Sequence, residues 1–439
     1  MSELGPEWLT VILFGSLVLL LLAGLPLVFA IGGIATFFII FLWGPQALPV
    51  LANRTYMAMD MFLLVAVPMF IFMGAMLQRC GIAEDMYELM YHWMGGLRGG
   101  LAGGTVLICT LFAAMAGISG AATTSMGLIA LPSMRKRGYK NDIAIGCITA
   151  GGSLGILIPP SVLMIILALT AKLSVGQLFI AGILPGMLLS GLFVGYILIR
   201  CYIQKDLGPA VPPDSRLPAA ERFRLLRALL LPVGLIFAVM GSMFFGLATP
   251  SEASAIGALG AMVSAMIKRT FNWKNFSSAL FITLRLSTMV IWIVFAASAF
   301  TALYAVTGAS SLVRGLITGI GDPWMVIITM QLILLVLGMF FDPTGIVLLT
   351  APLFFPIVTS LGFDPLWFAI LFVINMELAF LTPPFGFNLF YMKAVVPKDV
   401  TMVDIYKSST PFVLLMILGL GLCMTFPAII TWLPGLMIT

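Results

Sequence analysis

The sequence is poor in charged residues and contains almost no histidine. Only 9% of its 439 residues are charged, one residue is histidine, and 61% are hydrophobic. Soluble domains carry about 25% charged residues. A compact soluble protein could not cover this much apolar surface, so soluble, disordered and disulfide-stabilised classes are excluded. We therefore predict a membrane protein.

Signatures of catalysis and of metal binding are also scarce. The five cysteines lie far apart with no CxxC spacing, and the one histidine, His92, excludes a histidine-rich metal centre. No GxxxxGK[ST] motif is present, which excludes ATP hydrolysis through a P-loop. An intramembrane enzyme would need a nucleophile–base pair or a metal cluster, which these residues do not supply. We expect no enzymatic activity and no cofactor other than a coupling ion.

Apolar segments dominate the chain. Ten of them are consistent with one membrane crossing each: 9–24, 26–43, 60–79, 142–171, 178–199, 229–248, 252–267, 280–306, 365–391 and 411–433. Two further stretches, 101–134 and 323–361, are longer as helices than a ~30 Å bilayer core. Small or turn-forming residues interrupt them at 117–121 and 341–345. We predict that each forms a re-entrant helical hairpin, which leaves the membrane on the side where it entered.

The basic residues test this topology. With the N-terminus outside and both hairpins re-entrant, nineteen of the 22 lysines and arginines fall on one side, and only Arg54, Lys172 and Arg314 fall on the other. The positive-inside rule makes the nineteen cytoplasmic and both termini periplasmic. Because the basic residues lie in short loops between apolar segments, they indicate topology and not nucleic-acid binding.

The chain contains a weak internal duplication. The offset that maps Pro159-Pro160 onto Pro383-Pro384 also maps Pro132 onto Pro356 and one hairpin centre onto the other. In each unit a hairpin is followed by a helix that a Pro-Pro pair must break, because proline lacks an N–H group and clashes with the preceding turn. The two hairpins enter from opposite sides. Inverted repeats with broken helices are typical of secondary transporters.

Helix breaks inside a membrane create binding sites. Carbonyl groups freed at a break, together with nearby hydroxyl groups, are oxygen ligands suited to Na⁺, and the N-terminal ends of half-helices favour an anionic substrate. Asp342 and Glu377 are costly so deep in an apolar segment, which favours a functional role for each. Hydroxyl residues at the tips and breaks have either a ligand role or hydrogen bonds to their own helices. They are Ser119, Thr123, Thr124, Thr344 and Thr382.

Six motifs are spread over essentially the whole chain. The most specific are residues 150–161 (AGGSLGILIPPS) and 381–390 (LTPPFGFNLF). The others are 67–74 (VPMFIFMG), 117–122 (GISGAA), 131–139 (LPSMRKRGY) and 248–253 (ATPSEA). Together they resemble the large membrane subunit of the tripartite ATP-independent periplasmic (TRAP) transporters. Phe385 departs from the family pattern, where a small aliphatic residue is usual, and this bears on substrate size.

The resemblance implies a fold, a mechanism and two partners. The fold is an all-α, polytopic membrane protein with inverted repeats, of the elevator type, in which a mobile unit with both hairpins and both broken helices slides against a scaffold. The function is Na⁺-coupled symport of a small organic acid, such as a dicarboxylate or sialic acid, across the bacterial inner membrane. The partners are a periplasmic substrate-binding protein and a small four-helix membrane subunit.

On that resemblance we assign candidate sites and domains. The candidate ion-binding residues are Ser119, Gly120, Thr123, Gly152, Gly155, Pro159, Asp342, Thr344, Gly345, Thr382 and Pro383. The candidate substrate-binding residues are Ser119, Ala121, Pro160, Ser161, Glu377, Pro384 and Asn388. The expected domains are scaffold spans at 1–80, a first repeat core at 81–199, a cytoplasmic linker at 200–228, scaffold spans at 229–306, a second repeat core at 307–391 and a C-terminal span at 392–439.

Other transport functions remain open from the sequence. The main alternative is a self-sufficient ion-coupled carrier of the dicarboxylate or citrate type, which needs no binding protein. A channel would not need two opposed re-entrant units with paired breaks. Dicarboxylates, sialic acids and keto acids are all compatible with the sequence, as are Na⁺ and H⁺ as the coupling ion.

Overall fold

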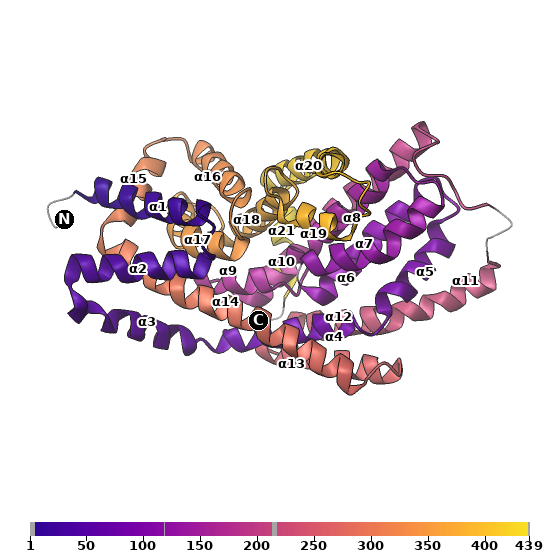
Figure 1. The fold of residues 1–439 in the computed structure, drawn as a ribbon, viewed down its shortest axis with the longest axis horizontal. Helices are drawn as coiled ribbons and strands as arrows, with labels where there is room; N and C mark the ends of the chain where they lie inside the picture. Colours follow the sequence, from indigo (N-terminus) through magenta and orange to yellow (C-terminus); the bar gives the residue numbers. More distant parts are fainter. Residues whose placement is uncertain (1–4, 118, 213–216, 438–439) are drawn as a thin grey trace.

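The computed structural model describes residues 5–117, 119–212 and 217–437, and all of its regular secondary structure in these ranges is helical. Ile118 in the first hairpin centre and Arg216 in the predicted linker lie outside the described residues. The molecule is elongated, with the N-terminus, α3 and α15 at one end and α5 and α11 at the other (Figure 1). The all-α fold class is confirmed.

Two helical units have matching layouts. The first consists of α6 (Gly100–Ala116), α7 (Ser119–Lys136), α8 (Asn141–Ser153), the short η3 (Leu154–Ile156) and α9 (Val162–Ala171). The second consists of α16 (Pro323–Gly338), α17 (Pro343–Ser360), α18 (Pro365–Phe380) and α19 (Phe387–Val395). In each unit a helical hairpin precedes a helix interrupted at a Pro-Pro pair, and both Pro-Pro peptide bonds are cis.

Local sequence explains where these helices start. Asp342 and Asp364 each cap a helix whose first residue is proline, and each carboxylate accepts a backbone N–H from the first turn. Proline suits this position because the first N–H groups of a helix have no partner within the helix. Ser161 restarts the first broken helix by accepting the Met164 N–H at 3.4 Å. Side chains at their first residues therefore help to set where α9, α17 and α18 begin.

The remaining helices surround these units. At the N-terminus they are α1 (Pro6–Leu22), α2 (Leu27–Trp43), η1 (Pro45–Ala47), α3 (Pro49–Met59), η2 (Phe62–Val65), α4 (Ala66–Leu77) and α5 (Ile82–Met94). Between the units they are α10 (Val175–Ile203), α11 (Ala219–Leu225), η5 (Leu226–Leu229), α12 (Leu230–Phe244), α13 (Pro250–Ile267), α14 (Trp273–Val306) and α15 (Ala309–Thr318). At the C-terminus they are α20 (Met402–Thr425), α21 (Ala428–Thr431) and η6 (Pro434–Leu436).

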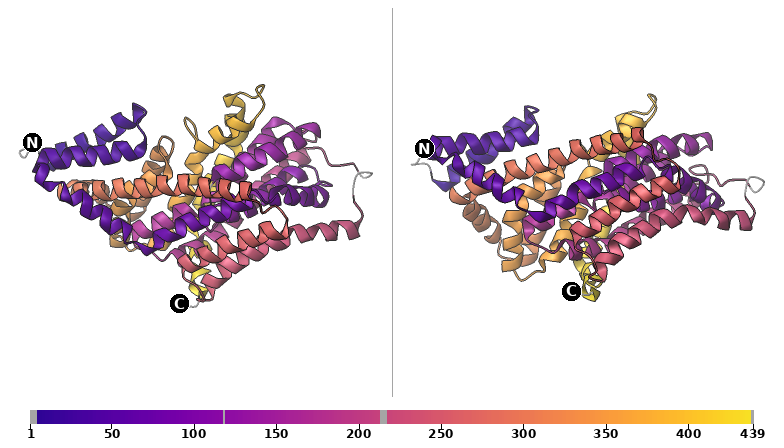
Figure 2. Two further views of the ribbon diagram at one scale, coloured as in Figure 1. Left: turned by 60° about the horizontal axis from the view of Figure 1, so that its bottom comes forward. Right: turned by 90° about the horizontal axis from the view of Figure 1, so that it is seen from below.

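Four of these helices form a layer along one face. Figure 2 shows α14, α4, α13 and α12 side by side and roughly parallel when the molecule is seen from below, in agreement with the contacts between neighbouring pairs. A separate apolar cluster joins α1 and α2 to α14, where Phe14 packs edge-on against Phe300 and Tyr304. These helices form the surroundings of the two hairpin units.

Fewer helices than the ten predicted crossings are long enough to span a bilayer alone. Among the described residues, five helical segments meet the length and hydropathy needed: Val175–Ile203, Glu221–Phe244, Trp273–Val306, Pro343–Ser360 and Met402–Thr425. A bent pair, Pro45–Met59 and Phe62–Leu77 at 66°, makes a sixth. The other apolar helices have 10–17 residues. Several of them are halves of broken helices or arms of hairpins, so each covers only part of the membrane thickness.

Three segments differ from the sequence prediction. The C-terminal span expected at 411–433 begins at Met402, because Thr401 and Asp404 form a capping box, and α20 continues through Pro411. The expected linker contains the helix α11, and its residues 204–212 pack against the turns before α6 and α8 through Gly99 N–H to Gly208 O and Lys140 N–H to Leu207 O. The helices α3 and α15 were not predicted.

Candidate functional site

The tip of the first hairpin lies against the first helix break. Gly117 has a φ of +63°, and a β-carbon at this position would lie 2.8 Å from the carbonyl oxygen of Pro160. A β-carbon on Gly152 of α8 would overlap the Thr123 side chain of α7. Glycine therefore allows the hairpin to approach the broken helix closely at two points. Four of the candidate residues, Thr123, Gly152, Pro160 and Ser119 at the start of α7, lie around this contact.

Asn388 connects the two units through buried hydrogen bonds. Its Oδ1 accepts the hydroxyl groups of Ser119, at 3.3 Å, and Thr123, at 2.6 Å, while its Nδ2 donates to the carbonyl oxygen of Thr149 at 2.5 Å. The Thr149 hydroxyl continues the network to Ser409 of α20 at 3.1 Å. All of these side chains are buried. The second broken helix thus holds the tip of the first hairpin.

These bonds also orient the hydroxyl oxygens. A hydroxyl group has one hydrogen to donate and two lone pairs. Because Ser119 and Thr123 both donate to the same amide oxygen, their lone pairs remain available to a cation. Among the described residues, no group of three or more histidine, cysteine, aspartate or glutamate side chains could hold a metal ion. A cation here would be held by hydroxyl and carbonyl oxygens.

The tip of the second hairpin lies against α2. Asp342 is half-buried and its Oδ2 accepts the Thr344 N–H at 2.9 Å, which caps α17. A β-carbon on Gly345 would overlap Leu27 of α2. Thr382, at the second break, donates its hydroxyl to the carbonyl oxygen of Leu378 at 2.7 Å. Asp342, Thr344 and Gly345 are thus joined in one turn, whereas Thr382 bonds to its own helix.

Tyr391 lies against the first hairpin tip and was not identified from the sequence. Its ring covers Gly120 at that tip, and Asp342 of the second tip lies near it. Tyr391 lies three residues after Asn388 in α19, so the two side chains share a helix face. That spacing is the one signal in the sequence that could have identified it.

The two helix breaks differ in exposure. Residues 151–161, including Gly155, Pro159, Pro160 and Ser161, are all buried, and Ser161 donates to the carbonyl oxygen of Ile156 at 2.7 Å. Pro383, Pro384 and Phe385 are exposed at the second break, where the Pro384 carbonyl accepts the Tyr406 hydroxyl at 3.0 Å. Ala121 at the first tip is half-buried. In this conformation the second break is the accessible one.

Glu377 is directed at the first break and not at the surface. It is fully buried in α18, and neither of its carboxyl oxygens has a hydrogen-bond partner among the described residues. The backbone of Leu157, just before the first Pro-Pro pair, lies near this carboxyl group. No substrate can reach this carboxyl group in the conformation described.

A salt bridge joins the loop after α19 to the first hairpin. Arg135 near the end of α7 donates to both carboxyl oxygens of Asp399, at 3.4 and 2.5 Å. This hydrogen bonding holds the pKa of Asp399 below its ordinary value. Lys393 also donates to the carbonyl oxygen of Val400 at 2.6 Å. The loop after α19 is therefore fixed to the unit that contains α7.

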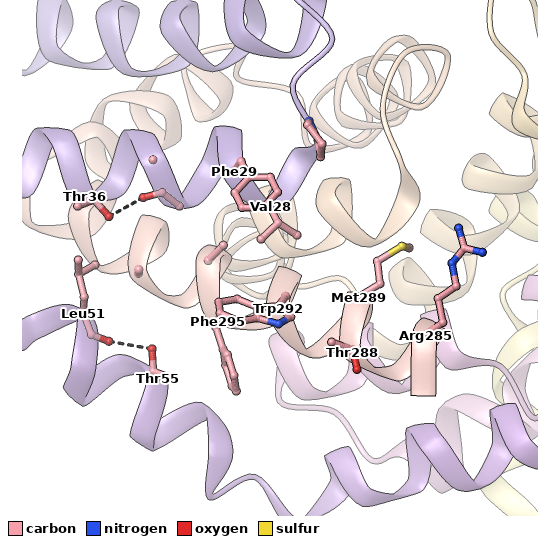
Figure 3. Close-up of a pocket in the computed structure, with 15 residues that line it drawn as sticks. Val28, Phe29, Thr36, Leu51, Thr55, Arg285, Thr288, Met289, Trp292 and Phe295 are labelled. Atoms are coloured by element: carbon pink, nitrogen blue, oxygen red, sulfur yellow. Dashed lines mark hydrogen bonds between the residues drawn. The ribbon is translucent and has the colours of Figure 1, made fainter. Parts of the chain in front are cut away.

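A large cavity lies beside the N-terminal helices. It has a volume of about 800 Å³ and opens between α2, α3 and α14 (Figure 3). Phe29, Trp292 and Phe295 line its middle and Arg285 lies at one end. Among the described residues, none of the candidate ion or substrate residues lines this cavity.

The chain is similar to known transporters over nearly its full length. The family described as "Tripartite ATP-independent periplasmic transporter, DctM component" matches residues 14–429. A C4-dicarboxylate TRAP transporter large permease protein of Pseudomonas aeruginosa is 32% identical over 400 residues, which cover 90% of this chain and 92% of that protein. A sialic acid TRAP transporter large permease protein of Vibrio cholerae is 28% identical over 420 residues, covering 95% and 96%.

The fold is also similar to that of a solved structure. MtrF of Neisseria gonorrhoeae, described as one of a class of antimetabolite efflux pumps, matches 88% of this chain and 85% of its own with a TM-score of 0.60. Sequence identity is 13%, so this likeness concerns the fold alone.

Proposed function

The chain belongs to the DctM component family of the tripartite ATP-independent periplasmic transporters, and we propose that it imports a small organic acid in symport with Na⁺. It is a multi-pass transport permease of a bacterial membrane system. The relatives are named as large permeases for different substrates, among them C4-dicarboxylates and sialic acid. The proposed substrate is therefore a carboxylate.

Family membership supports the proposed partners. The large permease acts with a small membrane subunit, and a periplasmic binding protein delivers the substrate from outside. The proposed location is the bacterial inner membrane, with the nineteen basic residues in the cytoplasm and both termini in the periplasm. The end of the molecule that carries α5, α11 and the linker is then the cytoplasmic end (Figure 1).

The observation that carries Na⁺ coupling is the hydrogen-bond arrangement at Asn388. The amide oxygen takes both hydroxyl hydrogens of Ser119 and Thr123, which leaves their oxygens free to bind a cation. Hydroxyl and carbonyl oxygens are hard ligands that suit such an ion. We assign a first ion to this place, with backbone oxygens from the segment that contains Gly152, Gly155 and Pro159. Gly120, which follows Ser119 in the same tip, is assigned to this ion as well.

We assign a second ion to the tip of the second hairpin and to the second helix break. Asp342 and Thr344 lie in one turn, and Gly345 follows them. The break at Thr382 and Pro383 would complete this set. The substrate carboxylate then lies between the tips, near Ala121, Pro384 and Tyr391, where the N-terminal ends of α7 and α17 favour negative charge.

We propose an elevator-type movement of the two units against the scaffold. Hydrogen bonds and the salt bridge join the first hairpin, α8, α19 and the loop after α19 into one body. The second tip touches the scaffold through Gly345 and Leu27 of α2, which is the kind of contact that a sliding unit would change. Glu377 and the buried residues Pro160 and Ser161 belong to the interior of that body in this conformation, and substrate contact with them requires another conformation.

A self-sufficient carrier of the dicarboxylate or citrate type remains the second candidate function. The fold likeness to MtrF is compatible with it, but it would not account for a match to the DctM component over residues 14–429. Uptake by the large subunit without a binding protein would favour this second function.

Variants of the ion sites test the coupling. Ser119→Ala and Thr382→Ala each remove one proposed ligand. In proteoliposomes that hold the complete transporter, each change should raise the Na⁺ concentration needed for half-maximal uptake by about tenfold, the equivalent of about 1.4 kcal/mol. Thr318→Ala, at an exposed end of α15, is the control. Unchanged Na⁺ activation in both variants would refute these assignments.

A further inference from the structure

Three aromatic side chains lie exposed beside the second helix break. Phe340 just before the second hairpin turn, Phe385 at the break and Phe390 in α19 are 41%, 48% and 46% exposed. The ring centroids of Phe340 and Phe385 are 6.0 Å apart, and those of Phe385 and Phe390 are 6.3 Å apart. We call these three rings the aromatic shelf. The shelf is built by three segments of one unit and presents a continuous apolar face.

The backbone beside the shelf is not helical. It lies between Phe380 and Phe387, and Pro383, Pro384 and Phe385 are exposed there. Non-helical backbone is tolerated at membrane depth only inside the protein or along a water-filled cavity. The nine residues of α19 span about 14 Å, close to half of a ~30 Å bilayer core. A water-filled cavity beside the shelf would explain an exposed break at this depth.

The shelf adjoins the proposed substrate site. Phe385 directly follows Pro384, and Phe390 directly precedes Tyr391, whose ring covers Gly120 at the first tip and lies near Asp342 of the second. A ligand whose carboxylate reaches the tips would therefore have its other end over the rings of Phe385 and Phe390.

We propose that the aromatic shelf binds an aromatic ring of the transported acid, so that the substrate class is an aryl carboxylate. This inference rests on the proposed function. Packing a second aromatic ring edge-on or offset against an exposed ring is favourable, beyond the area that it removes from water. A small dicarboxylate or a polyhydroxylated acid would leave the shelf in water. The expected ligand therefore has an apolar ring at one end, which contacts the shelf, and a charged carboxylate at the other, which reaches the hairpin tips.

Direct binding of two probe acids tests the proposal. Phenylacetate carries an aromatic ring and one carboxylate, and succinate is a small dicarboxylate without a ring. With the purified large and small subunits in Na⁺ buffer, calorimetry should give phenylacetate a Kd at least about tenfold below that of succinate. Phe385→Ala should weaken phenylacetate about tenfold and leave succinate unchanged.

Two further variants make the result specific. Phe37→Ala removes a ring that is 61% exposed on α2, far along the chain from the shelf, and should change neither Kd. Phe385→Leu keeps an apolar side chain while it removes the ring, and it should weaken phenylacetate alone, even if Phe385→Ala does not fold. Thermal unfolding of each variant monitors the fold.

The outcomes separate this inference from the function on which it rests. Succinate binding as tight as phenylacetate binding, or phenylacetate binding that Phe385→Ala and Phe385→Leu leave unchanged, would overturn the aryl assignment. Na⁺-driven uptake of another acid would then still support the symport. If no acid is taken up under any ion gradient, the symport itself fails, and the assignment of the shelf fails with it.

Discussion

At the residue scale, a glycine faces a hydroxyl group at the proposed first ion site. A β-carbon on Gly152 would lie 3.0 Å from the Thr123 Cα and would overlap its hydroxyl group. Because the close atoms include backbone, Gly152→Ala must displace the start of α7. We expect a loss of stability of about 1–3 kcal/mol, typical of overpacking. Uptake measured against Na⁺ concentration should also require more Na⁺ for half-maximal rate.

A second glycine provides the control for that change. Gly191 lies in α10, and nothing stands within 4 Å of a β-carbon built there. Gly191→Ala should therefore be neutral or slightly stabilising, since alanine favours helix more than glycine does. If Gly152→Ala matched Gly191→Ala in both thermal unfolding and Na⁺ activation, Gly152 would not hold Thr123 in place.

Some residues of the first site could be predicted from the sequence, but their contacts could not. Ser119, Thr123 and Asn388 were all candidates from the sequence: Thr123 in the ion set, Asn388 in the substrate set and Ser119 in both. Asn388 lies 265 residues from Thr123 in the chain, and no local pattern indicates that one amide oxygen accepts both hydroxyl groups. Tyr391 was missed because an aromatic residue in an apolar segment is ordinary until its neighbours are known.

At the element scale, the second break separates α18 from α19. Proline lacks an N–H group and clashes with the preceding turn, which keeps the segment between Phe380 and Phe387 out of a helix. The double change Pro383→Ala and Pro384→Ala allows one continuous helix there. It should turn Phe385 and Asn388 away from their present neighbours and reduce Na⁺-driven uptake to background, while circular dichroism shows equal or higher helix content.

A control variant at another proline separates the loss of the helix break from the loss of a proline in general. Pro411 lies within α20, which continues through it without a break. Pro411→Ala should retain uptake, because no break is removed. Normal uptake by the Pro383/Pro384 double variant would mean that the break is not needed for transport.

Elements with strong local signals were the predictable ones. The segments at 101–134 and 323–361 coincide with α6–α7 and α16–α17, because glycine and Asp-Pro turns mark their centres. The helices α3 and α15 were not anticipated, since each is short and borders an apolar span. The start of α20 depended on the capping box of Thr401 and Asp404, which lies before the apolar segment begins.

At the scale of the whole molecule, the two units form one body with one accessible break. The first break is buried, whereas Pro383, Pro384 and Phe385 are exposed. A transporter that alternates its access needs a site that opens to one side at a time. Which side of the membrane each end faces stays a prediction from the basic residues.

Na⁺-driven import is proposed to need three proteins acting together. The decisive experiment is uptake of radiolabelled phenylacetate and succinate into proteoliposomes, with the small subunit and the binding protein each present or omitted and Na⁺ imposed on one side. We expect uptake only when all three proteins are present and only with an inward Na⁺ gradient. Uptake by this chain alone, or equal uptake without Na⁺, would contradict it.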